Sequence, residues 1–447
     1  MNDTLELIRA GAGSGKTYNL CETVAEAVNQ GLDPARIMAT TFTKKAAAEL
    51  KGRIQSKLLA GEGNPEANQR NADRLELAAI GTVHSVAHRI LCRYAIQLGL
   101  STRLEVMTEE ASKRIVAQQL SELPIDGWKT LDECAHRFGI NDLKSTLSTL
   151  LDAKRGNKIS NDLFRSQLEN SAKRVCQMMA PLENLQGGNF DELLTMISDC
   201  LNNQTLKTCT TKDSEAALQK MKDLTNLRIG KWGVYAEASR LKAGKRSGAD
   251  AVLAPLRVLG ATVRNLKELH DDIVSFTSQL AEHVILIESG CQNYKTQRGL
   301  VDFTDLETLF LDALSGDQLA DLIAEDFSMV LVDEFQDTNP LQLAIFQAIR
   351  RISPRSRWVG DPKQAIFGFR GTDPGLVDRV WQQSQSAKRG TLPSNRRSQK
   401  GLVEFIGKIF TPIFGNDAQQ THVNPRQERG IERWLLDTTN QDEDPFA

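Results

Sequence analysis

The sequence predicts an α/β fold in which a parallel sheet is interrupted by a large all-helical insertion. Apolar segments of strand length alternate with helical patterns up to about residue 100, as in parallel strands joined by crossover helices. The pattern is then almost wholly helical, without a convincing strand pair, until about residue 299. Strand-like segments return after residue 300. We therefore expect a sheet domain that is split in sequence and joined in space.

The expected elements follow from apolar periodicity and from residues that end helices. Leu20, Val24 and Val28 share one face of the first helix, and Gly31 and Pro34 follow its end. In order, we expect strand 5–9, helix 17–30, strand 37–42, helix 44–59, strand 78–83, a helix to residue 94, strand 327–332, helix 341–351 and strand 356–359. The expected domains are the sheet (1–100 and 300–385), the helical insertion (101–299) and the start of a second sheet domain (386–447).

Length and composition are those of a large globular enzyme. A chain of 447 residues exceeds what one core normally fills, and 40% hydrophobic and 25% charged residues are ordinary values. The net charge is only −2, so nucleic-acid binding would depend on local patches. The seven cysteines include no Cys-x-x-Cys pair, which argues against an iron–sulfur cluster or a zinc ribbon. We find no membrane span or signal peptide and expect a cytoplasmic protein without a membrane partner.

A glycine-rich loop follows the first strand. Glycines let the backbone curl so that its N–H groups face a β-phosphate, and the next helix offers its positive end. Lys16 would reach the β- and γ-phosphates of ATP, and the Thr17 hydroxyl would coordinate Mg²⁺. The alternative is an ordinary helix entry, because the same residues favour turns and caps. The loop reads Ala10-Gly11-Ala12-Gly13-Ser14-Gly15-Lys16-Thr17, with Ala10 where Gly is usual.

A second apolar segment, about 315 residues later, ends in two carboxylates. We expect Asp333 to hold the Mg²⁺ shell and Glu334 to polarise the attacking water. Charged residues also end strands for purely structural reasons. The two motifs together, with Gln336 two positions after Glu334, predict an ATP site.

Six blocks of sequence occur in an order typical of one helicase family: residues 10–17, 40–50, 81–85, 331–340, 359–371 and 392–398, with a shorter block at 302–306. On these blocks the chain resembles a superfamily 1 DNA helicase of the UvrD/Rep type and is most similar to the RecB/AddA branch of helicase–nucleases. The blocks lie in about half of the chain. The resemblance implies a RecA-like P-loop NTPase sheet and the start of a second RecA-like domain.

The resemblance also implies roles around the nucleotide. Gln364 would sense the γ-phosphate, which suits an amide because it can donate and accept at once. Arg397 would reach across the cleft as an arginine finger. Arg396 stands where many relatives have an aromatic residue near the adenine, and a guanidinium can also lie flat on a base. Alternatively, these two arginines are a solvated pair.

For single-stranded DNA, the resemblance implies contacts at the ends of two strands. Thr41 and Phe42 would touch the strand, with Phe42 packing on a base or sugar, and Thr82 and His84 would bind phosphate or sugar. Phe42 could instead belong to the core, and His84 could be a satisfied surface histidine. Val83 replaces an aromatic residue that is common in the family.

A third set of DNA contacts is implied near residue 370. Phe369 would be the base-stacking platform, Arg370 would steady the strand, and Phe367 would reach the same track. Both phenylalanines could instead fill the core. Thr304 and Glu307 fit a helix capping box, which is a sufficient structural explanation for that block.

The resulting hypothesis is the N-terminal, ATP-binding part of a helicase that couples ATP hydrolysis to movement on single-stranded DNA in repair or recombination. Its substrate would be single-stranded DNA or a duplex with a single-stranded end. Only about 50 residues of the second lobe are present, so we expect a fragment, a split gene product or a decayed relative. A nuclease or a second-lobe subunit is the candidate partner. The alternatives are an ATP-gated DNA-binding module without productive unwinding, and a P-loop ATPase that works on protein partners.

Overall fold

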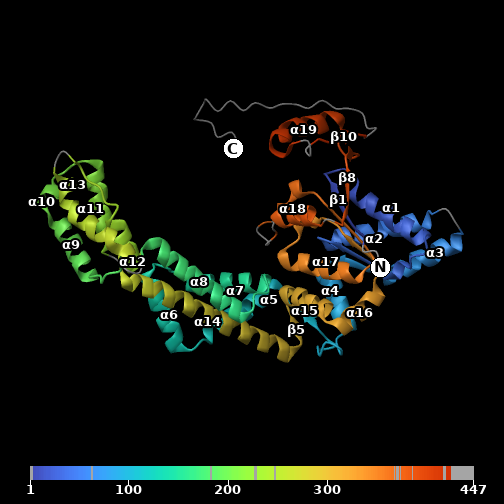
Figure 1. The fold of residues 1–447 in the computed structure, drawn as a ribbon, viewed down its shortest axis with the longest axis horizontal. Coiled ribbons are helices and arrows are strands. Elements are labelled where there is room, and N and C mark those ends of the chain that lie inside the picture. The colour runs from blue at the N-terminus through green and yellow to red at the C-terminus, as the bar shows by residue number, and fades with distance from the viewer. Residues whose placement is uncertain are drawn as a thin grey trace. The chain divides into compact units, whose positions relative to one another are not determined.

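The computed structural model describes residues 4–61, 64–181, 184–225, 229–245, 248–366, 368, 372, 374–384, 386–415 and 419–423. Two compact units are present (Figure 1): one comprises residues up to 105 and from 303 onward, and the other comprises residues 106–302. The sheet and the glycine-rich loop belong to the first unit.

The first unit is built on a six-stranded sheet in the order β3-β2-β6-β7-β1-β8. Each strand pairs in parallel with its neighbours, so the carboxyl ends of all six strands meet at one edge. Its strands are β1 (Thr4–Ala10), β2 (Ile37–Thr41), β3 (Ala79–Thr82), β6 (Met329–Val332), β7 (Arg355–Gly360) and β8 (Lys388–Leu392). The predicted parallel sheet is confirmed.

Burial explains why the central strands are continuous apolar runs. Every residue of β2 and of β6 is buried, because helices cover both faces of a parallel sheet. Leu20, Val24, Ile54, Leu331 and Val359 share one core cluster. Up to residue 383, the helices of this unit are α1 (Lys16–Asn29), α2 (Lys44–Leu59), α3 (Pro65–Arg74), α4 (Val83–Arg93), α15 (Phe303–Ser315), α16 (Asp317–Asp326), α17 (Pro340–Ile352) and α18 (Pro374–Gln383).

Two local predictions need correction. The strand expected to end at residue 83 ends at Thr82, whose hydroxyl accepts from the Ser85 N–H and caps α4. The predicted capping box at Thr304 and Glu307 is wrong. Helix α15 already includes Phe303, so Thr304 lies inside its first turn, and the Glu307 carboxylate accepts hydrogen bonds from side chains of other elements.

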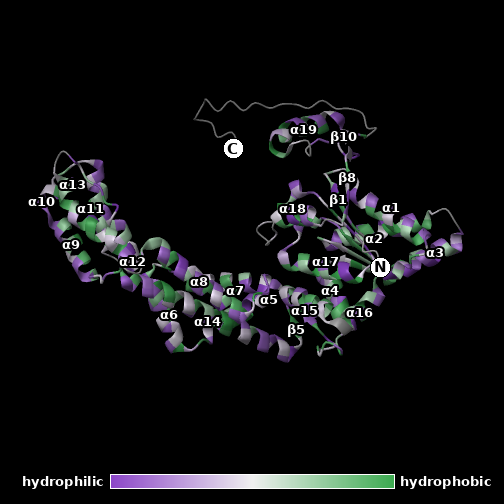
Figure 2. Cartoon of the chain, in the orientation of Figure 1, coloured by the Kyte–Doolittle hydropathy of each residue, from purple (hydrophilic) through white to green (hydrophobic). Residues whose placement is uncertain are grey.

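The second unit is helical. Figure 2 shows that its helices carry both hydrophobic and hydrophilic residues, and two clusters of buried apolar residues form its interior. Its helices are α5 (Glu109–Ser121), α6 (Ile125–Arg137), α7 (Leu143–Gly156), α8 (Asn161–Met179), α9 (Phe190–Asn202), α10 (Gln204–Lys207), α11 (Lys212–Leu224), α12 (Gly230–Ala238), α13 (Ala249–Ala261) and α14 (Lys267–Arg298).

One strand pair occurs where no pair was expected. The two-residue strands β4 (Glu105–Val106) and β5 (Leu300–Val301) pair where the chain enters and leaves the helical segment. Strands this short carry no readable alternation of apolar and polar residues. Nearby, the buried carboxylate of Asp302 accepts hydrogen bonds from Arg155 at 2.8 Å and from Lys295 at 2.9 Å.

A second sheet domain was expected to begin at residue 386, but β8 of that segment joins the first sheet. The rest of the segment contains β9 (Ser394–Asn395), α19 (Lys400–Phe414) and β10 (Thr421–His422). β9 and β10 pair in parallel, with α19 as the crossover between them. Among the residues that the structure describes, no helix combines the length and apolar character needed to cross a membrane.

Candidate nucleotide-binding site

The glycine-rich loop connects β1 to α1 with backbone conformations that favour glycine. Gly13 has φ 74° and Gly15 has φ 89°, both in the left-handed region. A Cβ on Gly13 would also lie 2.8 Å from the Asn395 Oδ1, so this position excludes a side chain for two reasons. The buried Ser14 hydroxyl has no hydrogen-bond partner among the residues that the structure describes. In the described part of the chain no side chain caps the N-terminus of α1, and its first N–H groups are therefore available to an anion.

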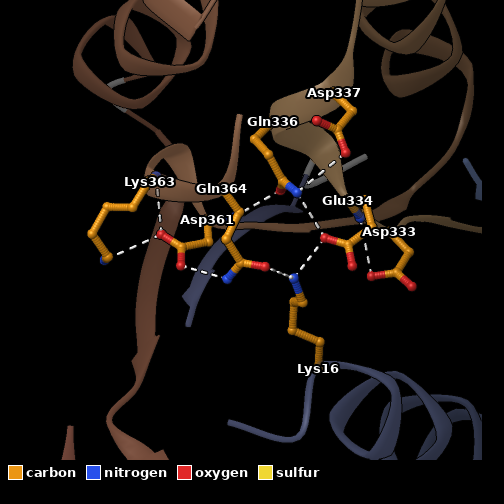
Figure 3. Close-up of polar contacts among 8 residues, drawn as sticks. All are labelled: Lys16, Asp333, Glu334, Gln336, Asp337, Asp361, Lys363 and Gln364. Atoms are coloured by element: carbon orange, nitrogen blue, oxygen red, sulfur yellow. Dashed lines mark hydrogen bonds and ion pairs between the residues drawn. The ribbon is translucent and has the colours of Figure 1, made fainter. Parts of the chain in front are cut away.

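The predicted lysine and acidic pair lie together at the carboxyl edge of the sheet (Figure 3). The Lys16 Nζ donates to the Glu334 Oε2 at 2.5 Å and to the Gln364 Oε1 at 3.5 Å. These contacts join segments 318 and 348 residues apart. The strand order places β6 between β2 and β7, and the Asp333 N–H donates to the Thr40 carbonyl at 2.9 Å.

The backbone of Glu334 is unusual. Its φ of 52° and ψ of 46° put a non-glycine residue in the left-handed region, at a cost of about 1–3 kcal/mol. The turn lifts the chain out of the strand directly after Asp333, so the two carboxylates leave the strand in different directions (Figure 3). The backbone strain therefore lies at Glu334, the residue that we expect from the sequence to polarise the attacking water.

Gln336 links this acidic turn to the next strand end, a role that sequence reasoning missed. Its side-chain amide donates to the Glu334 Oε2 at 2.8 Å, and its Oε1 accepts from the Asp361 N–H at 2.8 Å. The Asp361 carboxylate in turn accepts from the Gln364 Nε2 at 2.7 Å. Gln336 is only 2% exposed. The sequence signal for this role was the position of Gln336, two residues after Glu334. A buried amide at that position can join two loops.

Negative charge is concentrated at this edge. Burial, and then the charge of the neighbouring Glu334, raise the pKa of Asp333 to about 6, while Lys16 opposes the shift. Burial, and then Glu334, likewise raise the pKa of Asp337 to about 6. A bound cation would relieve this repulsion.

The ligand chemistry limits how such a cation would be held. Among the described residues there is no group of three or more His, Cys, Asp or Glu side chains that could hold a metal ion. Mg²⁺ is commonly held by one or two carboxylates together with phosphate oxygens and water. The Asp333 carboxylate and the Thr17 hydroxyl are oxygen ligands of this kind.

The start of the second sheet segment closes the other side of the loop. The Arg396 N–H donates to the Gly13 carbonyl at 2.8 Å, and the Asn395 Nδ2 donates to the Ala12 carbonyl at 3.1 Å. The Asn395 Oδ1 accepts from the Arg397 N–H at 3.0 Å. Asn395 therefore holds both arginines against the glycine-rich loop. Sequence reasoning did not single it out, although it lies in the last motif block.

An open cavity lies between these segments, and it is lined by Gly11, Gly13, Gly15, Lys16, Thr17, Tyr18, Arg53, Glu334, Arg396 and Arg397. Tyr18 was also missed by sequence reasoning. Its side chain is 57% exposed, and a Cβ on Gly15 would lie 3.8 Å from the Tyr18 Cβ and 3.9 Å from the Arg396 Cδ. Tyr18 and Arg396 therefore both lie near the end of the loop.

The candidate DNA contacts lie at the ends of β2 and β3. Thr41 is 3% exposed and its hydroxyl donates to the Thr43 carbonyl, whereas Phe42 is half-buried. Thr82 caps α4, and the half-buried His84 lies in the first turn of that helix. The His84 Nε2 is 3.0 Å from the Glu307 Oε1. The third set, Phe367, Phe369 and Arg370, lies outside the described residues.

The parallel sheet, the loop after β1 and the acidic end of β6 define a P-loop nucleotide-binding protein. Residues 2–385 match the family described as UvrD/REP helicase N-terminal domain. The chain belongs to this family, which confirms the predicted resemblance. Family membership implies the use of a nucleotide.

Similar proteins are named as the A component of an ATP-dependent helicase/nuclease, in agreement with the predicted RecB/AddA branch. The protein of Lactobacillus acidophilus is 23% identical over 92% of this chain and 39% of its own length. That of Latilactobacillus sakei is 26% identical over 91% of this chain and 53% of its own length. That of Streptococcus uberis is 23% identical over 91% of this chain and 37% of its own length. The chain thus spans between about two fifths and half of the length of these relatives.

Proposed function

We propose that this chain is the ATP-binding part of a DNA helicase that moves on single-stranded DNA in repair or recombination. The observation that carries the proposal is the contact between Lys16 and Glu334 at the carboxyl edge of the sheet, in a member of the UvrD/REP family. In such a motor, the energy of nucleotide binding and hydrolysis changes how the protein holds its DNA strand. Because the proposed substrates are ATP and DNA, we expect the protein to be located in the cytoplasm.

In this proposal, the N–H groups of residues 11–15 and Lys16 bind the phosphates. Thr17 and Asp333 hold Mg²⁺, which neutralises charge on the β- and γ-phosphate oxygens when it is bound. Lys16 is bound to Glu334 and must transfer its hydrogen bond to the γ-phosphate. That transfer frees the Glu334 carboxylate to accept a proton from the attacking water. Gln364, which accepts a hydrogen bond from Lys16, and Arg397, which lines the cavity, would respond to the γ-phosphate.

Tyr18 and Arg396 make a base site in the proposed cavity. An adenine placed beyond the loop would lie against the exposed Tyr18 ring, with the Arg396 guanidinium on its other side. This pair would replace the aromatic residue that the family resemblance places at position 396.

For DNA, we propose that Phe42 packs against a base or sugar and that Thr82 and His84 contact the backbone. Phe367, Phe369 and Arg370 extend the same track by resemblance. Thr41 supports the track through its hydrogen bond to Thr43. The names of the relatives suggest that the complete enzyme also has a nuclease activity and a second polypeptide.

The test is ATP turnover by the purified chain with and without single-stranded DNA. We expect turnover that rises with DNA and that Lys16→Ala abolishes, whereas Lys113→Ala, an exposed lysine on α5, leaves turnover unchanged. DNA binding without stimulated turnover would favour the ATP-gated binding module. Turnover with no DNA affinity at all would refute the DNA proposal and favour action on protein partners.

A further inference from the structure

A buried carboxylate links the proposed DNA track to the acidic turn. Glu307, on α15, is 4% exposed. Its Oε1 lies 3.0 Å from the His84 Nε2 and accepts from the Gln342 Nε2 at 2.6 Å. Its Oε2 accepts from the Asn339 Nδ2 at 3.3 Å. The His84 ring also packs against Phe303, with the ring centroids 4.7 Å apart.

The partners of Glu307 come from two different parts of the site. His84 lies in the first turn of α4, directly after the end of β3. Asn339 and Gln342 form the capping box that begins α17. Helix α15 packs against both α4 and α17, so one side chain can reach both.

The start of α17 is directly connected to the acidic turn. The short helix Phe335–Asp337 ends two residues before the Asn339 cap, and it contains Gln336, which is bonded to Glu334. Asn339 and Gln342 therefore lie directly after the acidic turn. Only a few residues of backbone separate Asn339 from Glu334. A change in the hydrogen bonds of Asn339 and Gln342 to Glu307 can therefore move the Glu334 carboxylate.

The hydrogen bonds on Glu307 are interdependent. A hydrogen bond to a buried charged group is stronger than one between neutral groups, and an unpaired buried carboxylate is costly. If His84 turns toward a DNA phosphate, Glu307 loses one of its three partners. The carboxylate then shifts toward Asn339 and Gln342, because these are the donors that remain.

We propose that Glu307 is a positioning residue that couples DNA binding at His84 to the geometry of the ATP-hydrolysing turn. The inference depends on the proposed DNA contact of His84. By linkage, nucleotide must then change DNA affinity by the same factor as DNA changes nucleotide affinity. Coupling can therefore be measured without hydrolysis.

The experiment measures binding of a fluorescent oligothymidine by anisotropy, with and without Mg²⁺ and a non-hydrolysable ATP analogue. The full chain is compared with Glu307→Gln, which keeps the shape of the side chain but leaves only one acceptor oxygen. The matched control is Glu76→Gln, whose carboxylate pairs with Lys51 at the surface. Gln342→Met is a second variant that removes the 2.6 Å bond from the other partner. Thermal unfolding shows which variants are folded.

We expect the nucleotide to change DNA affinity at least about fivefold in the unaltered chain and in Glu76→Gln. In Glu307→Gln and Gln342→Met this factor should fall below about twofold. A merely structural role would weaken binding with and without nucleotide equally and leave the factor unchanged, which would overturn the inference. A factor of one in the unaltered chain would overturn it as well. Absence of DNA binding by the unaltered chain would instead refute the proposed function on which the inference depends.

Discussion

Replacement of Gln336 by leucine tests whether the acidic turn is held by the buried amide. Leucine has a similar volume, so the change removes hydrogen bonds without opening a large cavity. Two bonds of 2.8 Å are lost, one to the Glu334 carboxylate and one from the Asp361 N–H. The effect on stability and the effect on catalysis can be separated.

The magnitude follows from the burial of each partner. The Asp361 N–H has no alternative acceptor in water because Asp361 is 3% exposed, and an unpaired buried donor costs about 1–3 kcal/mol. The Glu334 side chain is 33% exposed, so water replaces part of its lost bond, and about 1 kcal/mol is expected there. The free energy of unfolding should therefore fall by about 3 kcal/mol. For a domain of this size, Tm should fall by about 6–12 °C.

Calorimetry of the purified variant measures the stability, and steady-state ATP turnover measures the activity. Turnover should fall further than the folded fraction explains, since the Glu334 carboxylate loses the amide that orients it. Gln69→Leu is the matched control, because the Gln69 amide contacts only the exposed Asp73 side chain. If Gln336→Leu resembles this control in both measurements, the turn is held by other contacts and our reasoning is wrong.

Two further predictions concern charge and base recognition. The pKa of Asp333 and of Asp337, each raised to about 6, lies above the value of about 3.9 in an unfolded chain. The folded protein therefore binds protons that the unfolded chain releases, and the free energy of unfolding should fall by up to about 3 kcal/mol per group as the pH rises from about 4 to 6. Asp337→Asn should make this slope shallower in denaturant titrations at several pH values, and parallel curves would contradict the assignment. Tyr18→Ala should weaken ATP binding by about 5- to 30-fold through loss of stacking but leave binding of tripolyphosphate unchanged, as calorimetric titration can show. Tyr18→Phe should bind ATP normally, and equal losses for both ligands would exclude a base contact.

Much of this protein is determined locally and is therefore readable from its sequence. The glycine-rich loop needs residues that accept positive φ, and the strand before Asp333 is a continuous apolar run because both of its faces are buried. Helix α2 has the predicted bounds, since Thr43 caps its first turn and its apolar residues recur with the helical period. These signals depend on residues close together in the chain.

The tertiary structure decided which distant side chains meet. Strand order puts β6 between β2 and β7, and only that order brings Lys16, Glu334 and Gln364 to one place. Glu307 has the spacing of a capping residue but binds His84 and the start of α17, because helix packing placed better donors beside it. The spacing of residues along a chain limits their local conformation. Their partners across hundreds of residues depend on how the elements pack, and that packing is a property of the whole fold.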